Sequence, residues 1–333
     1  MDTNKKTSLK FLQNLVGKSN SNSSLEITCL IFKSIDNLNL IIYSGENKSI
    51  VCYDINNNQK INEVFEAHKN KITYLNKYSS YSSQKDRINL MLSISEKDNN
   101  LKVWNITNFQ CLHNFENINK QGWINCGCFL NDNDKIYVLS TNSMGYTRSP
   151  EPIKVFDLEG EKIMTIKNSN TNINFIDIFY DNKSSTKYII TGNIGFSRSY
   201  NYNKNIEYHT YKEKNIKFIL RSIIREKEDQ IDLIDLSQDG NIRIWNFHTA
   251  DLLQKIFCFK NTSDICLWDN EQLLACGGNR VKIIDLNKKE NKCELDLKDN
   301  ELTKISKVDH SKLGECLVSQ GRNIFKLWKL DNN

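Results

Sequence analysis

The sequence lacks any apolar run long enough to cross a membrane. Its longest apolar stretches, such as residues 38–43, fall far short of the roughly 18 consecutive residues that a membrane helix needs. Residues 1–10 are polar and charged, without the apolar region of a secretory signal. Together with 39% hydrophobic and 26% charged residues, these absences predict a globular protein that makes no contact with membranes. The expected location is the cytoplasm, with the nucleus as the alternative.

The sequence also lacks the common metal, phosphate and nucleophile motifs. Its ten cysteines form no Cys-x-x-Cys pair, and Cys126 and Cys128 have no second close pair or nearby His to complete a zinc site. Gly277 and Gly278 stand alone, so no Gly-rich phosphate loop is present, and no Gly-x-Ser-x-Gly occurs. We therefore expect buried free thiols in a reducing compartment, no metal, no cofactor, no small-molecule substrate and no enzymatic activity.

Strong charge of one sign is missing as well. The chain has 45 Lys and Arg residues against 40 Asp and Glu residues, a formal net charge of +5. The basic residues are interspersed with acids along the sequence, whereas a nucleic-acid-binding domain commonly gathers them in a stripe. The overall charge gives no support to nucleic-acid binding.

What the sequence does contain is a repeat. A hydrophobic strand, a turn and a second run of alternating apolar residues recur, and most copies end in an aromatic residue followed by Asp or Asn. Neighbouring copies are 39 to 52 residues apart, with their last residues at Asp54, Asn105, Asp157, Asn201, Asn246, Asp285 and Lys329. Seven units of this length are typical of four-stranded propeller blades.

The fifth unit shows how each repeat is built. Alternating apolar residues predict strands over residues 218–224, 231–236, 242–247 and 252–257. Between the second and third of them, Asp239 and Gly240 predict a tight turn, because this pair tolerates a positive φ angle. Four strands per unit predict an all-β protein with four-stranded antiparallel blades.

These motifs carry a resemblance to the WD-repeat (Trp-Asp repeat) β-propeller family. The best matches are residues 239–246, and residues 67–68 followed by 98–105. The resemblance covers about residues 27–330 and implies a seven-bladed propeller. Apolar residues at both alternating sets of positions in the third strands separately predict that neighbouring blades cover both faces of these strands.

The resemblance further implies a structural hydrogen-bond chain within a blade. Its members are a His before the first strand, a Ser or Thr in the second, an Asp in the next turn and a Trp in the third. Only the second blade can complete this chain. Its candidates are His68, Asp98, Trp104 and one serine, either Ser93 or Ser95, of which Ser95 is taken as the member. Asp239 and Trp245 are the counterparts in the fifth blade. Although His68, Ser95 and Asp98 are the residue types of a hydrolase triad, the buried structural network is the preferred interpretation.

Chain length predicts how the ring closes. Only three residues follow the third strand of the seventh unit, which is too few for a fourth strand. Residues 8–16 are the only spare segment with the apolar content of a strand. We predict that this N-terminal strand completes the last blade. Residues 1–26 then form the closing strand and a polar linker, and residues 27–333 form one propeller domain together with residues 8–16.

Two departures from the repeat are candidate binding surfaces. A long turn in the third blade places Tyr146 and Arg148 on the same ring face as Asp98 and Asp239, and both residue types are common at interfaces. Residues 197–211 of the fourth blade interleave aromatic and basic residues, which either stack on single-stranded RNA or form an ordinary strand pair. The expected function is a non-catalytic scaffold that binds other proteins in a multiprotein assembly. The alternative is an RNA-associated propeller that uses the fourth-blade segment.

Overall fold

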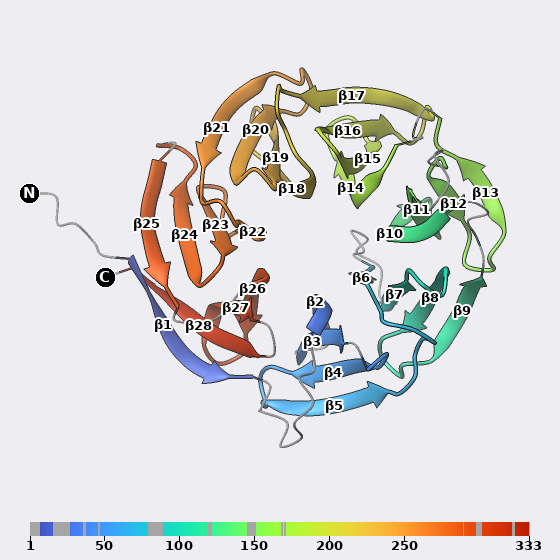
Figure 1. Ribbon diagram of the computed structural model, residues 1–333, viewed down its shortest axis with the longest axis horizontal. Coiled ribbons are helices and arrows are strands. Elements are labelled where there is room, and N and C mark those ends of the chain that lie inside the picture. The colour runs from blue at the N-terminus through green and yellow to red at the C-terminus, as the bar shows by residue number, and fades with distance from the viewer. Residues whose placement is uncertain are drawn as a thin grey trace, which may run out of the picture.

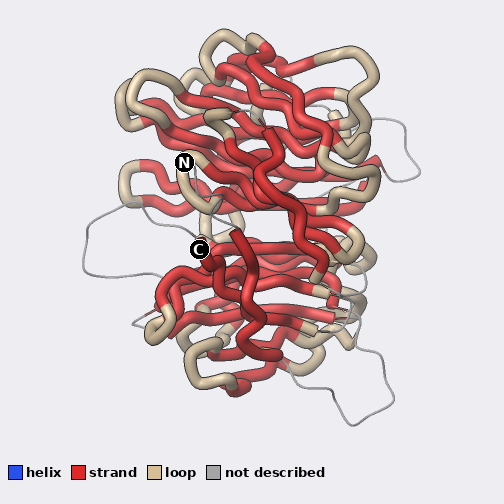
Figure 2. The backbone as a smooth tube through the Cα atoms, turned by 90° about the vertical axis from the view of Figure 1, so that its left-hand side faces the viewer, coloured by secondary structure: helices blue, strands red, loops and turns tan. Residues whose placement is uncertain are grey.

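The computed structural model is a ring of seven four-stranded antiparallel sheets, which confirms the predicted seven-bladed β-propeller (Figure 1). It describes the chain except for residues 1–6, 16–26, 36–37, 46, 79–88, 117, 119–121, 145–150, 168, 170, 289, 298–301, 322–323 and 333. In the side view, the described segments are strands joined by loops (Figure 2). No helix in this part of the chain has the length and apolar character required to cross a bilayer.

In blades 1 to 6 the strands run in sequence order from the ring axis to the rim (Figure 1). Blade 1 consists of β2 (Ile27–Ile35), β3 (Leu38–Gly45), β4 (Ile50–Asp54) and β5 (Gln59–Val64). Blade 2 consists of β6 (Tyr74–Lys77), β7 (Leu90–Ser95), β8 (Asn100–Asn105) and β9 (Cys111–Glu116). Blade 3 consists of β10 (Gly122–Asp132), β11 (Lys135–Met144), β12 (Lys154–Phe156) and β13 (Lys162–Thr165).

The remaining blades follow the same plan. Blade 4 consists of β14 (Ile173–Asp181), β15 (Thr186–Asn193), β16 (Phe196–Asn201) and β17 (Ile206–Lys212). Blade 5 consists of β18 (Ile219–Glu226), β19 (Ile231–Ser237), β20 (Asn241–Asn246) and β21 (Leu252–Phe257). Blade 6 consists of β22 (Asp264–Leu267), β23 (Gln272–Gly277), β24 (Arg280–Asp285) and β25 (Glu290–Asp296).

Blade 7 is closed by the N-terminal strand, as the strand count predicted. Its own strands are β26 (Lys304–His310), β27 (Gly314–Gln320) and β28 (Phe325–Asn332), and β1 (Thr7–Asn14) pairs antiparallel with β28. The rings of Phe11 and Trp328 meet edge to face at 5.3 Å. The strand begins one residue earlier than predicted and ends at Asn14. Leu15 follows it as a fully buried residue whose backbone N–H donates to the carbonyl of Phe325.

The four strands predicted for blade 5 agree with β18 to β21 within two residues at each end. The predicted tight turn is present, with Gly240 at φ 80° and its N–H donating to the carbonyl of Ser237 at 2.9 Å. A Cβ atom at Gly240 would approach the carbonyl oxygen of Phe259 to 2.4 Å. Glycine is required here by both the backbone conformation and the lack of space.

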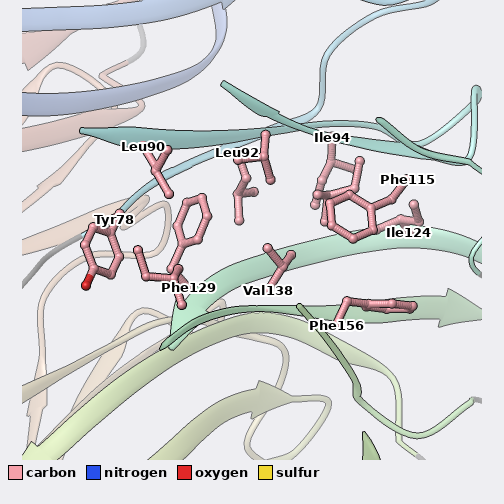
Figure 3. Close-up of a cluster of buried hydrophobic side chains, with 12 residues drawn as sticks. Tyr78, Leu90, Leu92, Ile94, Phe115, Ile124, Phe129, Val138 and Phe156 are labelled. Carbon is pink, nitrogen blue, oxygen red and sulfur yellow. The ribbon is translucent and has the colours of Figure 1, made fainter. Parts of the chain in front are cut away.

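The hydrophobic core lies between the blades. Each of the seven clusters of buried apolar residues in the described chain spans two adjacent blades. Figure 3 shows the cluster between blades 2 and 3, where Leu92 and Ile94 of β7 face Phe129 and Val138 of the next blade. Strands covered on both sides bury apolar residues at successive positions, as in β7 and β19.

Candidate functional site

Three of the predicted network residues of blade 2 meet through Ser93. The indole Nε1–H of Trp104 donates to Ser93 Oγ at 2.8 Å, and Ser93 Oγ lies 2.7 Å from His68 Nε2. On its other side, His68 Nδ1 lies 3.6 Å from a carboxylate oxygen of Asp98. Burial, followed by the charge of Lys102, lowers the pKa of His68 to about 4, so its imidazole is neutral at pH 7.

Ser95 does not take the place that the sequence assigned to it. It is buried two residues beyond Ser93, and the indole of Trp104 donates to Ser93 and not to Ser95. The strand register explains the difference: Ser93 pairs with Lys102, which places its hydroxyl beside the indole of Trp104, whereas Ser95 pairs with Asn100. The hydroxyl of the chain therefore belongs to Ser93.

In blade 5 a carboxylate occupies the position of Ser93. The indole of Trp245 donates to Asp235 Oδ2 at 3.0 Å, and Ser222 donates to Asp235 Oδ1 at 2.7 Å. Asp235 pairs with Arg243 across the sheet, two residues before Trp245, as Ser93 pairs with Lys102. Burial raises the pKa of Asp235 to about 6, although three side-chain hydrogen bonds act against it.

Asp239 has the turn position expected for it but a different partner. Arg243 donates to both of its carboxylate oxygens, at 2.6 and 3.2 Å, and also to Glu213 at 2.7 Å. Lys255 binds the other oxygen of Glu213 at 2.9 Å. Burial of Asp239 acts to raise its pKa, but the hydrogen bonds from Arg243 and Asn241, together with the charge of Arg243, outweigh this effect and the pKa is lowered. These two acids and two bases neutralise one another.

Sequence reasoning missed a third tryptophan with the same arrangement. Trp328 Nε1–H donates to Ser319 Oγ at 2.8 Å in blade 7. Ser319 pairs with Lys326, two residues before Trp328, so the register repeats that of blades 2 and 5. The available signal was the spacing of nine residues between this serine and its tryptophan, compared with ten and eleven in the other two blades.

The aromatic and basic segment of blade 4 forms a strand pair. Its residues lie in β16, β17 and the turn between them, and Tyr200, Tyr202 and Tyr211 are buried. The hydroxyl of Tyr211 donates to the carbonyl of Phe247 in the next blade at 2.7 Å. Because these three rings pack inside the ring wall, they present no face on which a base can stack.

The other predicted sites can be placed only in part. Tyr146 and Arg148 lie outside the described residues. Cys126 and Cys128 are buried, and burial raises the pKa of both thiols, that of Cys126 to about 12. The nine cysteines whose side chains are described are all free. Within the same described part, no three His, Cys, Asp or Glu side chains converge on a position for a metal ion.

A cavity of about 780 Å³ occupies the axis of the ring. Arg221 of blade 5 donates to both oxygens of Asp264 in blade 6, at 2.9 and 3.2 Å, and Asp264 also accepts the backbone N–H of Ile305 in blade 7 at 3.1 Å. Asp177 faces the open space, and the enclosing protein raises the pKa of its carboxyl. The cavity lining thus contains both acids and bases, and Arg221 is already paired with Asp264. Such a lining favours neither an anionic nor a cationic ligand.

The ring face that carries the second-to-third-strand turns and the connections between blades is here named the connection face. On it, four exposed apolar side chains form what we name the blade 4–5 patch: Ile194, Phe218, Leu220 and Phe257, with exposed fractions of 42%, 40%, 38% and 58%. Backbone contacts join the segments that carry these side chains. Ile194 forms an isolated β-bridge with Phe218, and the carbonyl of Phe218 accepts the N–H of Gln238 at 2.8 Å. The ring of Phe257 lies against Gly240 in the same turn.

Known proteins give no further guide to the chemistry of this surface. Comparison of the chain with models of protein families gave no match, and comparison with curated proteins gave none. The interpretation of the site therefore depends on its geometry.

Proposed function

We propose that this chain is a non-catalytic WD-repeat propeller that serves as a scaffold for other proteins in a multiprotein assembly. The observation that carries the proposal is the blade 4–5 patch, in which Ile194 and Phe218 remain exposed on short connections and Phe257 remains exposed at the end of β21. Clustered exposed apolar side chains on a folded protein commonly mark a surface that binds another molecule. The backbone hydrogen bonds between the connections support a rigid platform, which reduces the entropy lost on binding.

The hydrogen-bond chain of blade 2 supports the WD-repeat assignment. Trp104, Ser93 and His68 are the residue types that the resemblance implies, at the positions it implies. The same chain supports a structural role for these residues, because Ser93 is fully buried and its hydroxyl already accepts the indole hydrogen bond. Cytoplasmic localisation is part of the proposal and is supported by the many free thiols.

Affinity purification of the tagged full chain after cross-linking tests the proposal. We expect one or a few proteins to co-purify in constant ratio, with cross-links to the propeller and no loss after ribonuclease treatment. If nothing co-purifies beyond the tag-only control, the scaffold proposal is wrong. Complete loss after ribonuclease would favour the RNA-associated alternative, and covalent labelling of Ser93 or Ser95 by a serine-hydrolase probe would contradict a non-catalytic role.

A further inference from the structure

Four lysines surround the blade 4–5 patch. Lys212, Lys214, Lys217 and Lys260 are exposed, and among the described residues none of them forms an ion pair or a side-chain hydrogen bond. Lys214 and Lys217 lie in the connection that ends at Phe218, and Lys260 lies in the connection that follows Phe257. The lysines thus lie in or beside the same two connections as Phe218 and Phe257, while Ile194 lies in the turn between β15 and β16 and forms a β-bridge with Phe218.

The acids of this region do not cancel these charges. Glu213 and Asp239 are held by Arg243 and Lys255, two acids with two bases. The four lysines are therefore a local surplus of positive charge. On the opposite ring face, the turns of blades 5 and 6 expose acids instead, at Glu228, Asp229, Asp269 and Glu271. The fold separates charges that are mixed along the sequence.

We propose that the blade 4–5 patch, with its four lysines, binds an acidic protein segment that carries apolar side chains. This inference rests on the proposed scaffold function and adds the site and the partner's chemistry. Carboxylates of the segment pair with the lysines, which favours encounter and excludes basic segments. Its apolar side chains cover Ile194, Phe218 and Phe257, which supply the apolar area at the centre of the contact.

The shape of the patch favours a protein segment over a membrane surface. Leu220 belongs to the patch and also lines the axial cavity, so the apolar surface turns from the connection face into the mouth of the ring. A flat bilayer cannot follow this turn, whereas a chain can place a side chain there. A nucleic acid could stack only on Phe218 and Phe257, because the other two members of the patch, Ile194 and Leu220, offer no aromatic face to a base. Half of the apolar side chains would then stay uncovered.

The test uses the full chain and short fluorescein-labelled peptides in which Glu alternates with Phe and Leu. One control peptide has every Glu replaced by Lys, and another has Phe and Leu replaced by Ser. We expect the acidic apolar peptide to bind in fluorescence anisotropy and both controls to bind at least about tenfold more weakly. Absence of binding by the acidic apolar peptide, or equal binding by the basic one, overturns the proposal.

Matched variants locate the site. Lys214→Glu with Lys217→Glu, and separately Phe218→Ser, should each weaken binding by about tenfold or more. Lys135→Glu with Lys312→Glu, on the opposite face, and Ile163→Ser, on the outer strand of blade 3, should leave it unchanged, since all of these side chains are exposed. Melting curves show that each variant is folded. Binding that ignores the patch variants contradicts the assigned site.

Two further measurements separate this inference from its competitors and from the scaffold function. The first measurement is the binding of vesicles containing phosphatidylserine and of poly(U). If either binding requires the same residues and is not displaced by the peptide, the choice of a protein segment is wrong. If the wild-type chain and the double lysine variant co-purify the same cross-linked partners, the scaffold function stands and this inference fails. If neither captures a partner, the scaffold function fails as well.

Discussion

Asp235 accepts the indole hydrogen bond of Trp245 inside blade 5, and its carboxyl group is almost completely buried. The equivalent acceptor in blades 2 and 7 is a serine hydroxyl, at Ser93 and Ser319. A hydroxyl has no charge to desolvate, whereas the carboxylate does. Because blade 5 has an acid where blades 2 and 7 have a serine, the stability of blade 5 depends on pH.

Asp235→Asn should remove that dependence. The folded-state pKa of about 6 exceeds the ordinary value of 3.8, so the folded protein binds more protons and loses up to about 3 kcal/mol of stability as pH rises from 4 to 6. In urea unfolding, the variant should gain stability relative to wild type over this range. Asp229→Asn, at an exposed turn, is the control and should show no such gain. A constant difference between Asp235→Asn and wild type at all pH values would contradict the raised pKa.

His68→Gln should remove a pH dependence of the opposite sign. The folded-state pKa of about 4 lies below the ordinary value of 6.5, so the unfolded chain binds more protons between these values. Stability from the neutral imidazole is therefore complete above pH 6.5 and falls by up to about 3 kcal/mol as pH decreases to 4. Urea unfolding of the variant should lack this loss at acid pH. If the variant loses as much stability as wild type between pH 6.5 and 4, His68 is not kept neutral by burial.

Ser93→Ala and Ser95→Ala form a matched pair. Removing the Ser93 hydroxyl leaves the indole of Trp104 and the imidazole of His68 without their shared partner, at a cost of about 1–3 kcal/mol. Ser95→Ala removes a hydroxyl that contacts neither the indole of Trp104 nor the imidazole of His68, and it should cost clearly less. Thermal melts compare the two directly. The reverse order would restore Ser95 to the network.

Trp245→Ala should be among the most damaging single changes. The side chain is 2% exposed, and truncating a buried aromatic residue costs about 3–5 kcal/mol. His248→Ala, whose side chain is 40% exposed, should cost far less. Equal melting temperatures for the two variants would be incompatible with the burial described for blade 5.

Deleting residues 1–17 should expose the edge of β28. Without β1, the backbone groups of Phe325–Asn332 lose their partners, and Leu15 no longer fills the space between blades 7 and 1. Such an edge is a template for aggregation. Light scattering and limited proteolysis should show a less soluble and more easily cleaved chain. Phe11→Ala, which changes an exposed side chain of the same strand, should have a small effect.

The sequence predicted the architecture well because the blade motif recurs at a similar spacing along the whole chain. The strands of blade 5, the turn at Gly240 and the closing strand all followed from periodicity, turn chemistry and strand counting. Ser93 and Ser95 could not be separated in this way, because alternate residues of a strand point to the same face. Only the pairing register places one of them beside Trp104.

The surface chemistry was the least predictable part. The segment from Lys212 to Lys217 alternates acid, base and apolar residues, and in sequence it resembles any solvated connection. The net charge that this segment presents depends on Arg243 of β20, because Arg243 forms an ion pair with Glu213 and neutralises it. Fold geometry, and not local composition, decides which charges stay unpaired. The same reason explains why the tyrosines of blade 4 were ambiguous until their burial was known.

The pairing of β1 with β28 also determines when the protein can complete its fold during synthesis. The ribosome makes β1 before every other described strand and β28 after them, so the closing strand waits without its partner while six blades are built. Domains ordinarily fold as units while the chain emerges. Here closure joins segments more than 300 residues apart, which makes it the step with the highest entropic cost of bringing two segments together. The nascent chain is consequently most exposed to misassembly until β28 has emerged and paired with β1.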